Sequence, residues 1–465
     1  MNNIVWHNNK VDEITRINKL NQRGLVLWFT GLSGAGKSTI AVEVEAELTR
    51  LGFVAYILDG DNLRHGINSN LGFSKDDRDE NIRRIYEIAN LFCNAQIITL
   101  VSAISPYEKM RCEAREKIVG RDDLGAPADV SLFCEIYIKA SVETCKSRDP
   151  KELYKKEIIG ADTIYEAPEN PDIIIDTEKL SVEESVKIIV QYILEKQIDY
   201  LLPKILEIAI YAAYDAGKII LDVYKKDFDV KYKDDKSPLT EADKKSNGLI
   251  CGQLKKYSPY IDILAEESVD DKKRLSNKFC FIVDPLDGTK EFIKKNGEFT
   301  VNIGLSYNNK SVMGIIYAPC LNKFWYAVRN RGAYALDLNK NILKLFDGNT
   351  KIKVSERTQD LIVMKSRSHS DERTEALLEK NKNKIKIITD RGSSLKGCMI
   401  AEGLADIYYR FGYTMEWDTC AMQCIIEEAG GIFVQGDWTE MTYNRENSLN
   451  EKGFIILNRI ENKLD

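Results

Sequence analysis

The chain has 465 residues, of which 44% are hydrophobic, and its 66 Lys plus Arg against 72 Asp plus Glu give a formal net charge of −6. This length predicts two or three domains with packed cores, and the acidic balance argues against a general nucleic-acid binder. The ten cysteines form no C-x-x-C pair and there are three histidines. We therefore expect reduced thiols in a cytoplasmic protein and no zinc site. The first residues do not resemble a signal peptide, and no apolar run is long enough for a membrane span, so no membrane partner is expected.

The first motif is a glycine-rich stretch that matches G-x-x-x-x-G-K-[ST] at every fixed position. An apolar run at 25–29 predicts a buried strand before it, and residues 40–48 predict a helix after it. Glycines let backbone N–H groups surround phosphate oxygens, Lys37 adds positive charge for the outer phosphates, and the Ser38 hydroxyl suits Mg²⁺. The motif therefore predicts a nucleoside triphosphate site. Its residues are Gly31, Leu32, Ser33, Gly34, Ala35, Gly36, Lys37, Ser38 and Thr39.

Strands and helices alternate after this motif. Further apolar runs typical of strands lie at 52–58, 97–101 and 132–138. Asp59 and Asp61 directly follow the first of these, at the sheet edge where ligands collect. They suit either Mg²⁺ or a capped turn. The alternation predicts an α/β domain with a doubly wound parallel sheet.

A charged helix is expected after Ser74, which is placed to cap it. Arg78, Asn81 and Arg84 recur at helical spacing and therefore share one face. Such a face is either solvated or suited to a phosphate or sulfate group.

Residues 1 to about 197 resemble the adenylylsulfate kinase (APS kinase) family. The resemblance runs through Asp59-Gly-Asp-Asn-Leu-Arg-His-Gly66, Leu71-Gly-Phe-Ser74, Ile104-Ser-Pro-Tyr107 and Tyr165-Glu-Ala-Pro-Glu-Asn-Pro171. The family transfers the γ-phosphoryl group of ATP to the 3′-hydroxyl of adenosine 5′-phosphosulfate. The resemblance implies that Lys37 is catalytic and that Asp61 lies near the acceptor hydroxyl as base or metal organiser. The residues it implies for acceptor binding are Arg64, Phe73, Arg78, Asn81 and Ile104.

The resemblance leads to two further expectations, one for Ser105 and one for the segment between Lys156 and Tyr165. Ser105 matches a catalytic-site serine that the family has been described as phosphorylating, and a Ser-Pro turn accounts for it equally well. Between Lys156 and Tyr165 the family usually carries a longer lid with a phenylalanine against the substrate adenine. Residues 157–164 are shorter and lack that aromatic. Loss of one stacking partner is expected to weaken binding by about 1–3 kcal/mol.

The chain is expected to divide into domains at 1–199 and 200–465. Ser181 and Glu184 form a capping box for a helix that closes the first domain, and Pro203 is expected to open the next helix. No Gly/Ser-rich linker separates the two helices, so we expect the domains to keep a restricted relation.

Carboxylates are the main chemical feature of the second domain. The apolar run 281–283 ends in Asp284 and Asp287, Glu266 ends another short run, and Asp418 lies at an expected helix start. Each acid alone also suits a turn or a cap. Together, without His or Cys, they suit Mg²⁺, which is a hard cation.

Three motifs in this half, Ala265-Glu-Glu-Ser268, Asp284-Pro-Leu-Asp-Gly-Thr289 and Trp417-Asp-Thr419, resemble the inositol monophosphatase superfamily of Mg²⁺-dependent phosphatases. Residues 391–396 and 408–412 resemble 3′(2′),5′-bisphosphate nucleotidases within it. The resemblance covers about 200–465 and implies a layered αβαβα fold.

The same resemblance implies roles for individual side chains. Asp243 and Thr289 would orient and help deprotonate the attacking water. The N–H groups of Gly288 and Thr289 would hold the phosphate, while Ser394 and Lys396 would face the nucleotide. The implied metal ligands are Glu266, Asp284, the Leu286 carbonyl, Asp287 and Asp418.

The favoured hypothesis is a bifunctional enzyme of sulfate assimilation. One domain would make 3′-phosphoadenosine 5′-phosphosulfate (PAPS), and the other would remove the 3′-phosphate of adenosine 3′,5′-bisphosphate. The expected partners are ATP, adenosine 5′-phosphosulfate, adenosine 3′,5′-bisphosphate and a second copy of the chain, since both families commonly form dimers. Two alternatives stay open. The first half could be only a nucleotide-binding regulatory module, or the second half could be an inositol phosphatase.

Overall fold

The computed structural model describes residues 10–120, 132–148, 165–226, 229–232, 238–338, 349–367 and 372–464. The short segment 157–164 lies outside these ranges. The chain divides into two compact units, Met1–Leu201 and Leu202–Asp465, which are described separately. All ten cysteines are free thiols. Among the described residues, no helix combines the length and the apolar character that crossing a bilayer requires.

The first unit is built on a five-stranded parallel sheet with the order β2-β3-β1-β4-β5. Its central strand, β1, is buried along its whole length, as the apolar run predicts. The strands are β1 (Leu25–Thr30), β2 (Ala55–Asp59), β3 (Ile98–Ser102), β4 (Phe133–Lys139) and β5 (Ile173–Asp176).

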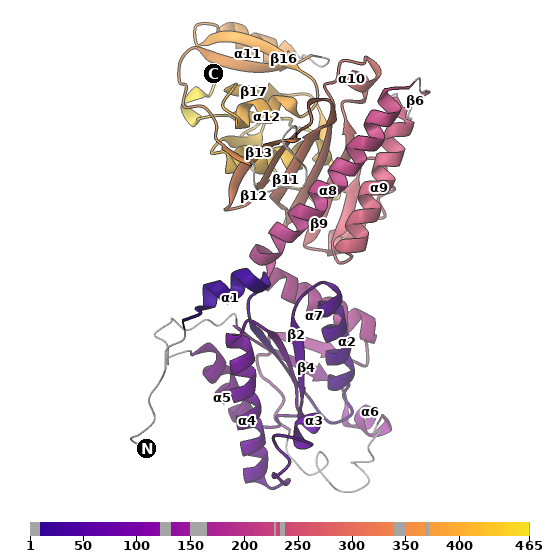
Figure 1. The fold of residues 1–465 in the computed structure, drawn as a ribbon, viewed down its shortest axis with the longest axis vertical. Coiled ribbons are helices and arrows are strands. Elements are labelled where there is room, and N and C mark those ends of the chain that lie inside the picture. The colour runs from indigo at the N-terminus through magenta and orange to yellow at the C-terminus, as the bar shows by residue number, and fades with distance from the viewer. Residues whose placement is uncertain are drawn as a thin grey trace. The chain divides into compact units, whose positions relative to one another are not determined.

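Helices cover both faces of this sheet (Figure 1). The helices α4 and α5 pack against the face that carries Val26 and Trp28, and α2 packs with α7. The helices are α1 (Glu13–Leu20), α2 (Lys37–Arg50), α3 (Gly60–Arg64), α4 (Lys75–Asn94), α5 (Glu108–Val119), α6 (Val142–Ser147) and α7 (Val182–Lys196). The predicted doubly wound parallel sheet is therefore confirmed. Ser74 caps α4 and Ser181 forms a capping box with Glu184 at α7, both as predicted.

The helix α8 (Ile198–Tyr224) begins before Pro203, so the prediction that Pro203 opens it was wrong. The Gln197 carbonyl accepts hydrogen bonds from the N–H groups of Tyr200 and Leu201, which starts the helix earlier. The first N–H groups of any helix lack partners within the helix, and Pro203 removes only one donor beyond that turn.

The second unit contains two large sheets. The first has seven strands in the order β14-β13-β12-β11-β10-β9-β8, antiparallel except for the β8–β9 pair. The second has five strands in the order β16-β15-β17-β21-β19. The strands of these sheets are β8 (Asp262–Ala265), β9 (Phe279–Asp287), β10 (Thr300–Tyr307), β11 (Lys310–Ala318), β12 (Lys323–Val328), β13 (Gly332–Asp337), β14 (Thr350–Ile352), β15 (Leu361–Ser366), β16 (Ile385–Arg391), β17 (Ile407–Arg410), β19 (Ile432–Gln435) and β21 (Phe454–Leu457).

Two short ribbons, further helices and short 3₁₀ turns complete the described part of this unit. The ribbons pair β6 (Val230–Tyr232) with β7 (Pro238–Thr240) and β18 (Thr414–Met415) with β20 (Leu449–Asn450). Besides α8, the helices are α9 (Glu241–Tyr257), α10 (Thr289–Ile293), α11 (Glu372–Lys380), α12 (Leu395–Ala401) and α13 (Glu416–Glu428). A short 3₁₀ turn, Lys273–Ser276, precedes β9.

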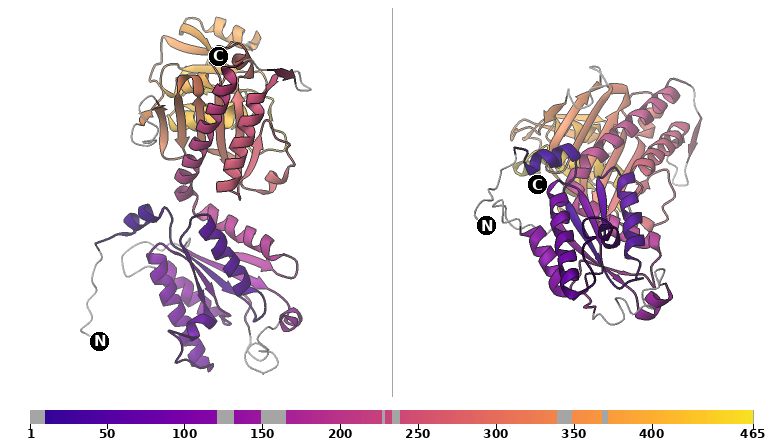
Figure 2. Two further views of the ribbon diagram at one scale, coloured as in Figure 1. Left: turned by 45° about the vertical axis from the view of Figure 1, so that its right-hand side comes forward. Right: turned by 60° about the horizontal axis from the view of Figure 1, so that its bottom comes forward.

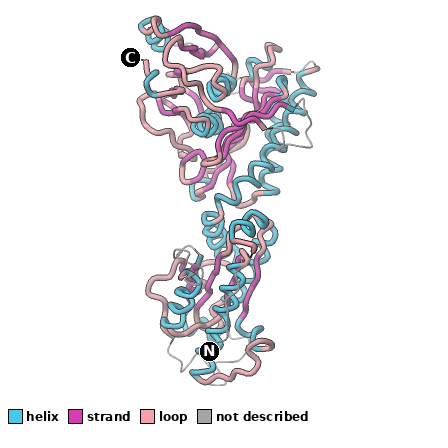
Figure 3. The backbone as a smooth tube through the Cα atoms, turned by 60° about the vertical axis from the view of Figure 1, so that its left-hand side comes forward, coloured by secondary structure: helices cyan, strands magenta, loops and turns pink. Residues whose placement is uncertain are grey.

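Layers of helix and sheet alternate through the second unit (Figure 2; Figure 3). The helices α8 and α9 cover one face of the seven-stranded sheet, α12 and α13 lie between the sheets, and α11 packs beyond the five-stranded sheet. A Cβ at Gly314 would lie 2.1 Å from the Ala421 carbonyl oxygen, so glycine permits the close approach of α13 to β11. The expected αβαβα layering is confirmed.

Candidate active sites

The glycine-rich loop joins β1 to α2, in the context that the motif predicts. Gly31, Gly34 and Gly36 have φ of 148°, 80° and 105°, values that favour glycine. The buried Lys37 begins α2, and its Nζ donates hydrogen bonds to the carbonyls of Gly31 and Leu32 at 3.0 and 2.8 Å. The loop's own carbonyl groups therefore hold the ammonium group beside the helix start that favours a phosphate.

A cavity of about 710 Å³ lies beside this loop, a volume that suits a cofactor-sized ligand. Except for Gly31, it is lined by all the residues that the sequence predicts for this site. These are 32–39, Asp61, Arg64, Phe73, Arg78, Asn81, Ile104 and Ser105. The structure therefore brings the predicted triphosphate and acceptor residues to one cavity at the carboxyl ends of the strands.

Two carboxylates face this cavity from the end of β2. The Ser38 hydroxyl donates to Asp59 Oδ2 at 2.7 Å and lies 3.1 Å from the Ser102 hydroxyl. Asp59 also caps α3 through the N–H groups of Asp61 and Asn62. The predicted magnesium ligand, Ser38, thus already contacts a carboxylate, and hydroxyl and carboxylate oxygens are ligands that Mg²⁺ accepts.

Phe73 is held between two arginines at the cavity wall. The Arg64 guanidinium lies 4.6 Å from its ring centroid, and Arg78 Nε donates to its carbonyl at 2.9 Å. Phe73 is 53% exposed and lines the cavity, so it is accessible to a planar ligand. Asn81 is buried and accepts a hydrogen bond from Asn68 at 2.9 Å. Arg84, on the same helix, instead pairs with Glu80.

Ser105 is buried, with 1% of its surface exposed. Its hydroxyl accepts a hydrogen bond from Trp28 Nε1 at 3.0 Å and lies 3.2 Å from the Thr30 hydroxyl. Its φ of +40° places it in the left-handed region. These contacts favour the turn explanation over the modified serine.

Sequence reasoning missed part of the cavity wall. Thr177 lines the cavity, and its hydroxyl donates to the Ala35 carbonyl at 3.1 Å. Arg148, which also lines the cavity, donates to the Thr177 hydroxyl and carbonyl at 2.9 and 3.0 Å. Both residues lie more than a hundred positions from the loop in the sequence, so no local pattern indicates this contact.

The second site is centred on three carboxylates. One oxygen from each of Asp284, Asp287 and Asp418 lies within 4.8 Å of the others. They line a cavity of about 330 Å³ together with Glu266 and Leu286. The structure thus brings all five predicted metal-ligating residues to one cavity. These oxygen donors suit a hard divalent cation.

The negative charges of these carboxylates repel one another, which raises the pKa of individual members of the cluster. Burial first, and then the carboxylates of Glu266 and Asp287, raise the pKa of Asp284 well above its ordinary value. Burial and Asp287 likewise raise the pKa of Asp418 to about 7. A bound cation would offset this repulsion, so the donor set fits a metal ion.

Asp243 and Thr289 are hydrogen-bonded to each other across two helix starts. The Thr289 hydroxyl lies 3.1 Å from Asp243 Oδ1 and 3.3 Å from the Leu286 carbonyl. Asp243 Oδ2 accepts from the Thr240 N–H and hydroxyl at 2.7 and 2.6 Å. Burial raises the pKa of Asp243, and the hydrogen bonds from Thr240 and Thr289 oppose this rise. Thr289 and Gly288 line the cavity, and Asp243 supports them from behind.

A serine and several basic side chains line the same cavity beside the carboxylates. Ser394 donates to Asp287 Oδ2 at 2.7 Å, and the buried Lys396 donates to the carbonyls of Arg391 and Ser393 at 3.2 and 2.6 Å. Burial lowers the pKa of Lys396 to about 8. Three arginines that received no site role from the sequence also line this cavity: Arg367, Arg391 and Arg410. The site therefore combines carboxylates with side chains suited to phosphate.

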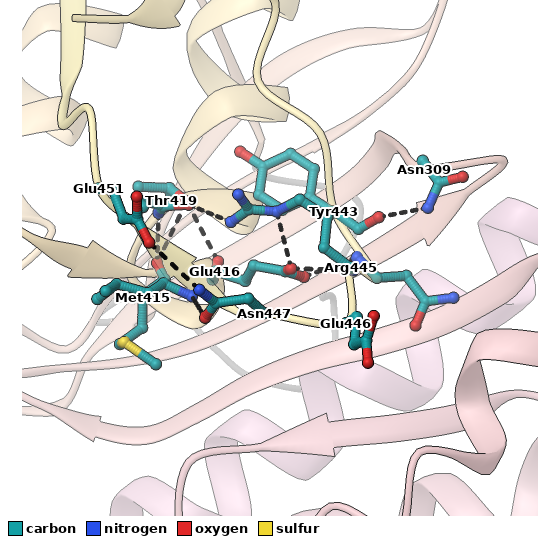
Figure 4. Close-up of polar contacts among 12 residues, drawn as sticks. Asn309, Met415, Glu416, Thr419, Tyr443, Arg445, Glu446, Asn447 and Glu451 are labelled. Carbon is teal, nitrogen blue, oxygen red and sulfur yellow. Dashed lines mark hydrogen bonds and ion pairs between the residues drawn. The ribbon is translucent and has the colours of Figure 1, made fainter.

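A buried polar network that includes Met415, Glu416 and Arg445 lies at the start of α13 (Figure 4). The fully buried Glu416 accepts from the N–H groups of Asn444 and Arg445 and from Arg445 Nε, at 2.6, 3.0 and 3.1 Å. Asn450 donates to the Met415 carbonyl at 2.8 Å, and the Met415 N–H donates to Asp418 at 2.6 Å. Glu416 was missed because an acid in a helix start resembles an ordinary cap.

Comparison with known families agrees with both sites. The inositol monophosphatase family matches residues 201–462, more than half of the chain, and the adenylylsulphate kinase family matches residues 23–176. The adenylyl-sulfate kinase of Staphylococcus carnosus (strain TM300) is 48% identical over 203 residues, which cover 42% of this chain and 97% of that protein.

Two solved structures resemble one part of the chain each. CysQ from Bacteroides thetaiotaomicron, a bacterial member of the inositol monophosphatase family, is 37% identical over 56% of this chain and 99% of its own, with a TM-score of 0.49. The Mycobacterium tuberculosis APS kinase CysC, in complex with AMPPNP and APS, is 41% identical over 37% of this chain and 98% of its own, with a TM-score of 0.33.

The fold and the two sites thus define a P-loop nucleotide-binding domain and a carboxylate-centred phosphatase domain. The chain belongs to the inositol monophosphatase family, and its first domain belongs to the adenylylsulphate kinase family. Both family resemblances inferred from the motifs are confirmed. Enzymes of the former family depend on metal ions, and those of the latter use ATP.

Proposed function

We propose that the first domain transfers the γ-phosphoryl group of ATP to the 3′-hydroxyl of adenosine 5′-phosphosulfate. The observation that carries this proposal is the single cavity lined by both the P-loop and the predicted acceptor residues. A phosphoryl transfer needs its two substrates in line and its charge neutralised, more than it needs covalent chemistry.

Each side chain then has a defined task. The loop amides hold the phosphates, Lys37 neutralises the transferred group, and Ser38 with Asp59 holds Mg²⁺. Asp61 orients the 3′-hydroxyl, Phe73 stacks on the adenine, and the phosphosulfate is bound by Arg64, Arg78, Asn81 and the backbone at Ile104. A Mg²⁺ ion held there would supply positive charge that offsets the negative charge of the phosphates.

The alternative in which this domain only binds nucleotide is not favoured. The kinase relative matches over nearly its whole length, and the described cavity contains acceptor as well as triphosphate residues. Incubation with ATP, Mg²⁺ and adenosine 5′-phosphosulfate tests the proposal. We expect PAPS to form. Intact ATP binding without PAPS formation would support the regulatory alternative.

We propose that the second domain hydrolyses the 3′-phosphate of adenosine 3′,5′-bisphosphate to AMP and phosphate. The carrying observation is the carboxylate cluster that shares one cavity with Ser394 and Lys396. Glu266, Asp284, the Leu286 carbonyl, Asp287 and Asp418 would hold Mg²⁺. The bound metal would acidify water and stabilise the oxygens of an in-line displacement.

Side chains and backbone N–H groups of this domain position the attacking water and the substrate. The Asp243–Thr289 pair orients the attacking water and accepts its proton. The N–H groups of Gly288 and Thr289 hold the 3′-phosphate. Ser394 and Lys396 face the nucleotide, and the adjoining arginines suit its 5′-phosphate.

Comparison of adenosine 3′,5′-bisphosphate with inositol 1-phosphate tests the substrate assignment. We expect phosphate release from the nucleotide to be strongly preferred. Equal rates on both would favour the inositol phosphatase alternative.

We further propose that the chain forms a homodimer and acts in the cytoplasm, where its free thiols stay reduced.

A further inference from the structure

Arg111 in α5 is among the largest fully buried side chains, with 1% of its surface exposed. Its guanidinium is divided among several partners. Nε pairs with the buried Glu135 at 2.7 Å, Nη1 donates to the Ser105 carbonyl at 2.7 Å, and Nη2 donates to the Glu166 carbonyl at 2.7 Å and pairs with Glu108. A buried charge of this kind is costly to desolvate, so stability alone is a weak reason for its presence.

The first segment that Arg111 holds, 104–106, is a wall of the kinase cavity. Ser105 in its centre has a φ of +40°, and such a conformation costs about 1–3 kcal/mol for a residue other than glycine. The Thr30 hydroxyl holds the Ile104 carbonyl at 2.7 Å, and Trp28 holds the Ser105 hydroxyl. Arg111 is therefore the charged member of a set of contacts that keeps this wall in a strained shape.

The second segment that Arg111 holds is 165–166, where Tyr165 also lines the cavity. The Glu166 N–H donates to the Pro106 carbonyl at 2.8 Å, and the Tyr165 hydroxyl lies 3.1 Å from that of Thr30. One guanidinium thus fixes two cavity walls that lie far apart in the sequence. Neither contact involves the P-loop itself.

We propose that Arg111 is a positioning residue for the acceptor nucleotide of the kinase. It acts by holding the strained wall 104–106 against residues 165–166, and it leaves the triphosphate site unaffected. This inference rests on the proposed kinase function.

Arg115 offers a matched control on the same helix. It pairs with Asp172 at 2.7 Å and with Glu135 at 3.8 Å, and it packs over the Phe133 ring. It therefore shares a carboxylate partner with Arg111, while its other partners, Phe133 and Asp172, do not line the kinase cavity. An Arg115→Met variant removes a guanidinium from the helix without touching the cavity walls.

The test uses the full-length parent, Arg111→Met, Arg115→Met and the double variant Arg111→Met/Glu135→Gln, which leaves no unpaired buried carboxylate. Calorimetry measures binding of ADP with Mg²⁺, and then of adenosine 5′-phosphosulfate to the ADP-loaded protein. Steady-state kinetics measure KM for each substrate.

For both Arg111 variants we expect acceptor affinity to fall and acceptor KM to rise, by roughly 10- to 100-fold, because small misplacements of a positioning wall have effects of this size. ADP affinity and KM for ATP should stay at parent values, and Arg115→Met should change neither. Acceptor affinity equal to the parent's would overturn the inference, as would a parallel loss of ADP affinity in the double variant. Failure of the parent itself to bind the acceptor would overturn both this inference and the proposed kinase function.

Discussion

Asp284→Asn is predicted to change the stability of the phosphatase domain in opposite directions with and without Mg²⁺. The substitution keeps the side-chain shape, and an amide oxygen can still accept the hydrogen bond that the Leu286 N–H donates at 2.9 Å. It removes one charge from a cluster in which three carboxylate oxygens lie within 4.8 Å of one another. The metal-free protein should therefore gain stability, and the metal-loaded protein should lose it.

The magnitude follows from the electrostatics of the cluster. Each pKa unit of relieved repulsion is worth about 1.4 kcal/mol, and burial followed by the charges of Glu266, Asp287 and Asp418 raises the pKa of Asp284 well above its ordinary value. Relief of one unit should raise Tm by roughly 3–6 °C for a domain of this size. Mg²⁺ at a hundred times its dissociation constant stabilises the parent by about 2.7 kcal/mol, and a variant without one ligand charge should lose most of this.

The assay is thermal unfolding at pH 8, first in EDTA and then across a Mg²⁺ titration. ADP identifies the transition of the kinase domain by shifting it. Asp271→Asn is the matched control, because Asp271 is an exposed carboxylate paired with Lys273 outside the cluster. The reasoning is refuted if Asp284→Asn is less stable than the parent in EDTA, or if Mg²⁺ stabilises both equally.

Three further predictions concern single groups. Since the folded pKa of Asp418 (about 7) lies above its ordinary 3.8, the proton it retains stabilises the metal-free domain at low pH. That contribution should be lost as pH rises from about 4 to about 7. In EDTA, the Tm of the parent should therefore fall relative to that of Asp418→Asn over this pH range. A Tm difference that stays constant with pH would contradict the prediction. Glu416→Ala should destabilise the protein by about 3–5 kcal/mol in urea unfolding, because Arg445 loses its ion-pair partner and two backbone donors lose their acceptor. Glu440→Ala, at an exposed pair with Lys310, should change stability little, and equal losses would argue against the network. Ser105→Ala should cost about 1–3 kcal/mol, because Trp28 Nε1 loses its acceptor, while PAPS formation persists. Lost PAPS formation at unchanged stability would instead favour the modified serine.

Local motifs predicted the parts of each site that lie close together in sequence. Gly31–Thr39 carries its own geometry, since the glycines, the lysine and the helix start are contiguous. Asp284 to Thr289 is similar, because a strand end, a turn and a helix start follow one another. The family resemblance then supplied distant partners such as Asp243, Glu266 and Asp418.

Side chains whose role depends on tertiary packing escaped sequence reasoning. Arg111 lies on an ordinary amphipathic helix, and only the fold brings it to Ser105 and Glu166. From the sequence alone, Glu416 resembles an acid in the first turn of a helix. Only the fold brings the N–H groups of Asn444 and Arg445 to its carboxylate. The prediction for Pro203 was wrong because α8 begins at Ile198, and the local pattern did not indicate that the Gln197 carbonyl accepts the first hydrogen bonds of this helix.

The central claim is that one chain carries two independent phosphate chemistries on adenosine nucleotides. The most direct measurement assays the parent, Lys37→Ala and Asp284→Ala for PAPS formation and for phosphate release from adenosine 3′,5′-bisphosphate. We predict that the parent performs both reactions, that Lys37→Ala loses only the first, and that Asp284→Ala loses only the second. A parent that performs one reaction alone, or a variant that loses both while remaining folded, would contradict the account.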